Sequence, residues 1–322
     1  MSPPIAAVLL AAVVLPHLLR NDGLIPSTGI ALWTAVLALR AILVISAALT
    51  IVLYLPATQL FHLLTSWCLH AVLPFFATHL GFSGHRLGEM ATLIPAVALA
   101  LSLIVAVFSH WRAAHRVQAW LRGNAVGSGP GESVIVVEPE VMLAAAGVRK
   151  ARVIVSAGAL LALDEGELNA GIEHERGHIK RRHSYVSAVA RVLYAVARGL
   201  PGTSRVQEQL TFYLERDADE YAIKRTGDPL ALAAAICKSK QSLPALSSVA
   251  FATLAGAGAP RRLRLLLDRN ASHPSALISA VGVLLTVSAL ALTLVLLADL
   301  PGLIHGGVIA MAHAPAGPFC PD

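Results

Sequence analysis

The sequence has few charged residues, few aromatic residues and few cysteines. Only 14% of its 322 residues are charged and 5% are aromatic. The three cysteines, Cys68, Cys237 and Cys320, form no CxxC pair, so neither a disulfide framework nor a cysteine metal site is indicated. In contrast, 56% of the residues are hydrophobic, and they are unevenly distributed along the chain. This composition points to a membrane protein.

Long apolar runs predict membrane-spanning helices. The clearest run, residues 275–300, has no charged residue before Asp299 and exceeds the roughly 20 helical residues needed to cross the hydrocarbon core. Residues 90–108 and 30–55 are further expected spans. Polar residues within the spans, as a transporter or channel subunit would need, are almost absent from 90–108 and 275–300.

The N-terminal region also contains three less regular features. Residues 4–19 predict a shorter span, since they lack the basic start and the cleavage pattern of a secretory signal. Residues 57–80 are apolar with polar residues at helical spacing, so this segment is either an amphipathic interfacial helix or an extra span. For Arg40, we expect that its side chain snorkels to the inner surface and that the span proper begins at Ala41.

The distribution of basic residues predicts the orientation. All but three of the 25 Lys and Arg residues lie between Arg112 and Arg269, so the positive-inside rule places this region in the cytoplasm. The net charge of +6 is thereby explained next to a lipid bilayer, and direct binding of nucleic acid is not indicated. We expect a multi-pass protein of the cell membrane. Its parts are a membrane domain over 1–110, a cytoplasmic domain over 111–274, a membrane helix over 275–300 and a short extracytoplasmic tail over 301–322.

The cytoplasmic part predicts a mainly helical α+β domain. Two runs, "SVIVVEPE" and Arg152–Ser156, are typical of short strands. Asp164 and Glu167 form a capping box that begins a helix running through "LNAGIEHERGHIKRR". Turn and capping residues then predict three more helices, over Tyr185–Leu200, over Ser204–Thr226 and from Asp228-Pro229 onward.

The helix that begins at the capping box of Asp164 and Glu167 carries an HExxH motif. His174 and His178 are four residues apart, so both imidazoles lie on one helix face and can meet at a single zinc ion. Glu175 is placed to act as general base on a water molecule at that metal. A motif of five residues is suggestive but not decisive, and the rest of the sequence has to supply a third ligand.

The stretch "YLERDADEYA" supplies that ligand on the third expected helix. A catalytic zinc site needs a third protein ligand and an open position, and Glu215 is the candidate. Asp219 lies on the same face, four residues later, where it can accept a hydrogen bond from a ligand imidazole. The alternative is that these acidic residues form a solvated face. The HExxH motif upstream favours the ligand interpretation.

Together these motifs resemble those of integral-membrane gluzincin peptidases. The run "RVIVSAGALLALDEGELNAGIEHERGHIKRRHS" followed by "ERDADEYA" is similar to the BlaR/MecR antirepressor type, and to the HtpX and CAAX-processing peptidases related to it. The arrangement of spans is most similar to the first group. Those receptors carry a penicillin-binding sensor domain after the last span, whereas no SxxK pattern occurs in this chain after residue 300.

The resemblance implies a zincin-like domain with one Zn²⁺ per chain. By this resemblance His174, His178 and Glu215 bind the metal, Glu175 activates water, and Asp219 supports a ligand histidine. It also implies that a substrate peptide adds as a strand to the sheet edge near Val153 to Ser156. The implied function is a zinc metalloendopeptidase.

Several alternatives remain open at the level of the sequence. The substrate is either a cytoplasmic regulator, such as a small DNA-binding repressor, or damaged membrane protein as in the HtpX group. A zinc-stabilised signalling scaffold is the alternative that is not an enzyme, although Glu175 has no use in a purely structural site. No oligomeric state is predicted. Four residues are candidates for the oxyanion partner: His183, Tyr185, Tyr213 and Tyr221. For His183 we favour the alternative that it is a polar residue in a lipid-facing turn and has no role in the site.

Overall fold

The computed structural model describes residues 23–58, 92–146, 151–241, 252–253, 258–268 and 276–312. The expected span over 4–19 lies outside these residues, as does all of 57–80 except its first two positions. The predictions for these two segments therefore stay predictions.

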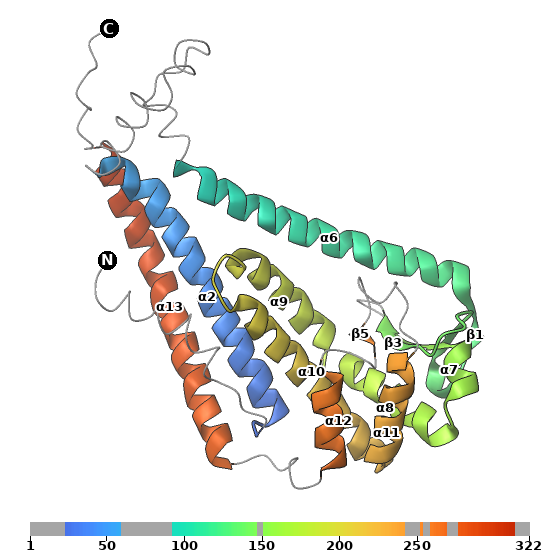
Figure 1. Ribbon diagram of the computed structural model, residues 1–322. Coiled ribbons are helices and arrows are strands. Elements are labelled where there is room, and N and C mark those ends of the chain that lie inside the picture. The colour runs from blue at the N-terminus through green and yellow to red at the C-terminus, as the bar shows by residue number, and fades with distance from the viewer. Residues whose placement is uncertain are drawn as a thin grey trace.

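The described part of the chain is mostly helical, with one small sheet (Figure 1). The longest helices are α2 (Pro26–Tyr54), α6 (Ile94–Asn124) and α13 (Ala276–Ala312). The other helices are α7 (Ala157–Ala162), α8 (Glu165–Lys180), α9 (His183–Ala197), α10 (Thr203–Thr226), α11 (Pro229–Gln241) and α12 (Ala259–Leu267), with short 3-10 turns at Leu55–Ala57 and Pro130–Glu132. The strands are β1 (Ala125–Ser128), β2 (Val134–Val136), β3 (Leu143–Ala146), β4 (Arg152–Ser156) and β5 (Ala252–Thr253).

Three helices, α2, α6 and α13, are long and apolar enough to cross a membrane, which indicates a membrane protein. Helices α2 and α13 run side by side in the same direction (Figure 1). Glycines on α13 permit the close approach, since a Cβ at Gly282 would lie 2.6 Å from Leu24 and one at Gly307 would lie 2.5 Å from Leu53. Helix α6 runs at a large angle to this pair and contacts α2 and α9, but its most apolar window has no buried residue. Its apolar side chains are therefore free to contact lipid.

The expectation that the Arg40 side chain snorkels to the membrane surface is wrong, because the side chain is buried within the protein. That the span begins at Ala41 stays a prediction. Arg40 lies in the middle of α2 and is completely buried. Its guanidinium donates hydrogen bonds to Thr203 Oγ1, at 2.9 and 3.1 Å, and to the carbonyl oxygens of Leu200 and Pro201. These groups lie between the end of α9 and the start of α10, where backbone carbonyls and the negative end of the α9 dipole favour a cation. Arg40 thus joins α2 to the domain that contains α9 and α10.

We expect Arg40→Leu to destabilise the protein by about 1–3 kcal/mol, because Thr203 Oγ1 and the carbonyls of Leu200 and Pro201 each lose a buried donor. The measurement is thermal unfolding of the detergent-purified protein, followed by the loss of α-helical circular dichroism. Arg198→Leu is the matched control, since Arg198 is exposed and donates to Ser102 Oγ on α6. Equal losses of stability in the two variants would contradict this role of Arg40.

The sheet has the strand order β1-β2-β4-β3-β5. β4 is central, parallel to β2 and antiparallel to β3, so the expectation that residues 153–156 form a free edge for a substrate strand is wrong. β1, β3 and β5 were not predicted. β3 is the run Leu-Ala-Ala-Ala, whose alanines have low strand propensity, and β1 lies in a glycine-rich stretch that reads as a turn.

The helical starts and stops follow the sequence closely. Asp164 Oδ1 accepts from the Glu167 backbone N–H at 2.8 Å while Glu167 Oε2 accepts from the Asp164 N–H at 2.9 Å, which is the predicted capping box. α10 ends at Gly227 in the left-handed conformation, and Asp228 caps α11 as expected.

Two apolar cores hold the domain around helices α8 and α10. One core joins α2, α9 and α10, and the other joins the sheet, α8 and α11. Helices α8 and α10 approach closely at Gly177, where an added Cβ would lie 3.1 Å from the Ala218 Cα. This glycine inside the HExxH motif therefore lets α10 come within reach of the two histidines.

Candidate metal centre

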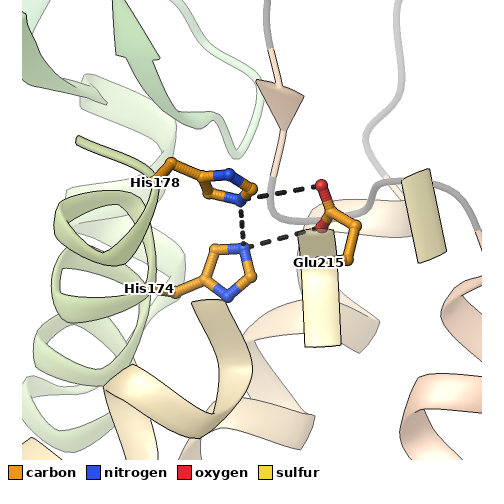
Figure 2. A group of neighbouring side chains, drawn as sticks. All are labelled: His174, His178 and Glu215. Carbon is orange, nitrogen blue, oxygen red and sulfur yellow. Dashed lines mark hydrogen bonds and ion pairs between the residues drawn. The ribbon is translucent and has the colours of Figure 1, made fainter. Parts of the chain in front are cut away.

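The structure brings His174, His178 and Glu215 together in one buried cluster (Figure 2). The candidate ligand atoms of the three side chains all lie within 4.8 Å of one another. The two histidines come from α8, and their Nε2 atoms are 3.2 Å apart. Glu215 comes from α10, with Oε2 3.6 Å from His174 Nε2 and Oε1 3.6 Å from His178 Nε2. Three lone-pair donors thus converge on one point.

The acidic residues of α10 do not form a solvated face. Glu215, Asp217 and Asp219 are all buried, and Asp219 Oδ1 lies 2.9 Å from His174 Nδ1. At this distance the Asp219 carboxylate interacts directly with the His174 imidazole. It orients His174 so that Nε2 faces the cluster, which is the supporting position expected for Asp219.

The two histidines have opposite pKa shifts. Burial alone would lower the pKa of His174, but its contacts with Asp219 and Glu215 outweigh burial and raise the pKa to about 9. Burial lowers the pKa of His178 to about 3. The neutral His178 ring therefore presents a free lone pair, whereas His174 has to lose a proton before it binds a metal.

His183 is part of the site, and the preference for a lipid-facing turn is wrong. Arg182 adopts a left-handed conformation, with φ of 55°, which folds the chain back so that the buried His183 Nδ1 lies 2.9 Å from His178 Nδ1. His183 Nε2 lies 3.0 Å from Asp217 Oδ2, and Asp217 Oδ1 accepts from Arg181 Nη1 at 2.8 Å. When His178 Nε2 is left free for a metal, His178 Nδ1–H donates to His183 and His183 Nε2–H donates to Asp217.

The tyrosines proposed as oxyanion partners lie in different environments. Tyr213 is buried in the core against Gly29 of α2, on the opposite side of α10 from Glu215. Tyr185 is 53% exposed. Tyr221 packs near Gly177 on the α8–α10 contact. The geometry therefore gives no reason to assign the oxyanion role to one of them.

Glu175 is completely buried, and neither of its carboxylate oxygens has a hydrogen bond of ordinary geometry. Burial raises its pKa to about 8, and the backbone amide of Ala145 on β3 only partly counteracts this effect. A buried carboxyl group without a partner is costly to maintain for structure alone. Together with the raised pKa, this favours a role in proton transfer.

Arg262 on α12 contacts the carboxylates of Glu215 and Asp219 on α10. The sequence alone does not identify this residue as part of the site. Burial alone would raise the pKa values of Glu215 and Asp219, but the Arg262 guanidinium and the contacts with His174 together outweigh burial and lower both. The two carboxylates are therefore charged in the buried cluster. The HExxH spacing does not predict that Arg262, His183 or Asp217 belongs to the site, because their contacts depend on how the helices cross.

The residues of this cluster fit a zinc ion. Two imidazole nitrogens and one carboxylate oxygen form the donor set of catalytic zinc sites, which have three protein ligands and an open fourth position. The convergence of buried lone pairs is explained by a cation at this point.

Comparison with known proteins agrees with this chemistry. Residues 115–209 match the model of Peptidase family M48, so a zincin-like metallopeptidase domain of that family is present. The match includes α8 with the HExxH motif and ends before Glu215, which rests on the geometry alone. No curated protein matches the chain.

Proposed function

We propose that this protein is a membrane-embedded zinc endopeptidase whose metal is held by His174, His178 and Glu215. The observation that carries the proposal is the buried convergence of these ligands beside an unpartnered Glu175, within a domain that matches a peptidase family. Three apolar helices support placement in a membrane. The excess of basic residues on the domain side supports a cytoplasmic orientation.

Each side chain has a separate task in this proposal. When bound, zinc supplies Lewis-acid polarisation of the scissile carbonyl and increases the acidity of water. Glu175 accepts the proton from the attacking water and passes it to the nitrogen of the leaving amine. Asp219 and the pair of His183 and Asp217 hold the two ligand imidazoles in the tautomers that point Nε2 at the metal.

We propose that the substrate is a cytoplasmic or membrane-associated protein, in particular a regulator such as a small DNA-binding repressor. The similarity of the span arrangement and the motifs to the BlaR/MecR antirepressor type supports this choice. The second candidate is quality control of membrane proteins in the manner of HtpX. A zinc-stabilised signalling scaffold is the alternative without catalysis, and the unpartnered Glu175 disfavours it.

Removal of the metal tests the proposal. We expect 1,10-phenanthroline to abolish cleavage of an unfolded protein such as casein by the detergent-purified protein, and about one equivalent of Zn²⁺ to restore it. Cleavage is measured by gel electrophoresis and mass spectrometry. Cleavage that persists after zinc has been removed to below one tenth of an equivalent would contradict a zinc peptidase.

A further inference from the structure

Arg262 is the one fully buried arginine among the described residues of the domain between α6 and α13. It lies on α12, and its partners lie on α10. Its Nε and Nη2 donate to the two oxygens of Asp219, at 2.8 and 2.6 Å, and its Nη1 donates to Glu215 Oε2 at 2.6 Å. One guanidinium thus binds the candidate third ligand and the residue that orients His174.

The planar shape of the guanidinium fixes both carboxylates. Two parallel hydrogen bonds hold Asp219 so that Oδ1 also faces His174 Nδ1 at 2.9 Å. The third hydrogen bond takes Glu215 Oε2, while Oε1 faces His178 Nε2 at 3.6 Å. A lysine has one compact ammonium group and cannot reproduce this three-point geometry.

Charge gives a second reason for this arrangement. Glu215 and Asp219 are four residues apart on one helix face, and like charges at this spacing repel each other. Both are buried, so water does not screen the repulsion. Arg262 neutralises one of the two charges and leaves one for a bound cation.

The docking of α12 does not depend on Arg262 alone. The neighbouring Arg261 stacks over the Phe212 ring at 3.7 Å and donates to Gln209 Oε1 at 3.1 Å. Leu263 and Leu266 pack against the core that contains α8 and α11. Arg261 therefore offers a matched control on the same helix, away from the two carboxylates.

We propose that Arg262 is a positioning residue of the metal centre, which holds Glu215 and Asp219 in the orientation that zinc binding requires. α12, which precedes the last membrane helix, is thereby part of the site. This inference rests on the proposed function, because it assumes that His174, His178 and Glu215 bind zinc.

The test compares the zinc affinity of Arg262→Lys with that of the wild type and of Arg261→Lys. Affinity is measured on full-length protein in detergent by competition with a fluorescent zinc chelator. The absorption spectrum of the Co²⁺-substituted proteins reports the ligand geometry. We expect Arg262→Lys to bind zinc about 10- to 100-fold more weakly, with an altered cobalt spectrum, and Arg261→Lys to remain within about twofold of wild type.

Wild-type affinity and an unchanged cobalt spectrum in Arg262→Lys would overturn the role of Arg262 and leave the peptidase proposal intact. Equal losses in both variants would assign the effect to the docking of α12 and also overturn it. No zinc binding by the wild type would overturn both proposals. If Arg262→Lys does not fold, the double variant Arg262→Met/Asp219→Asn removes the ion pair from both sides, and wild-type zinc affinity in that protein would overturn the inference.

Discussion

Glu175→Gln is expected to lower the rate of peptide hydrolysis by about 10²- to 10⁴-fold while zinc stays bound. Glutamine has nearly the same shape as glutamate but cannot accept a proton. Glu175 is not among the three residues that converge as ligands, so its loss leaves the metal in place. The measurement is the rate of peptide cleavage together with the zinc content of the same preparation.

Glu165→Gln is the matched control for this experiment. Glu165 lies on the same helix, in its exposed first turn, and undergoes the same change from carboxylate to amide. We expect it to retain wild-type activity. The proposal would be contradicted if Glu175→Gln cleaved as fast as the control. A variant that lost zinc together with activity would instead make Glu175 a ligand.

His178→Ala is expected to abolish stoichiometric zinc binding, and therefore activity. The variant leaves only His174 and Glu215, and catalytic zinc needs three protein ligands. His183→Ala provides a graded comparison, because it removes the partner of His178 Nδ1 and leaves all three ligands in place. We expect it to weaken zinc affinity by about 10- to 100-fold. Both affinities are measured by chelator competition.

His115→Ala provides the control for loss of a histidine, since His115 is exposed on α6 and is not among the three residues that converge as ligands. It is expected to bind zinc like the wild type. Full zinc occupancy in His178→Ala would mean that the zinc is held by a different set of residues.

The sequence predicts the local features of the site well, because they depend on short spacings. The capping box at Asp164 and Glu167 begins α8, and a spacing of four residues places His174 and His178 on one face. The same spacing relates Glu215 and Asp219 on α10. These patterns are complete within one helix each, so no knowledge of packing is needed to recognise them.

The contacts between helices are not predictable in the same way. Arg262 meets Asp219 across 43 positions of sequence, and one arginine in the basic run "PRRLR" does not differ from its neighbours until α12 docks. The position of His183 depends on the left-handed conformation of Arg182, and no residue type at this point of the sequence predicts that conformation. Gly177 lies inside the HExxH motif, yet its role in the approach of α10 appears only when the two helices cross.

The errors at the membrane have a similar origin. Hydropathy treats a span as a helix surrounded by lipid, so the sequence predicts that the Arg40 side chain reaches the membrane surface. In the structure α9 and α10 cover this part of α2 and provide hydrogen-bond acceptors for Arg40. The family resemblance implies that β4 is an edge strand, but the alanine-rich β3, which the sequence does not reveal as a strand, pairs with it on the side away from β2.

The most direct test of the account is X-ray absorption spectroscopy at the zinc edge of the purified, zinc-loaded protein. The account predicts about one zinc per chain, with two imidazole nitrogens at about 2.0–2.1 Å and the remaining ligands oxygen. Sulfur ligands at about 2.3 Å, or a shell without imidazole, would contradict a metal centre built from His174, His178 and Glu215.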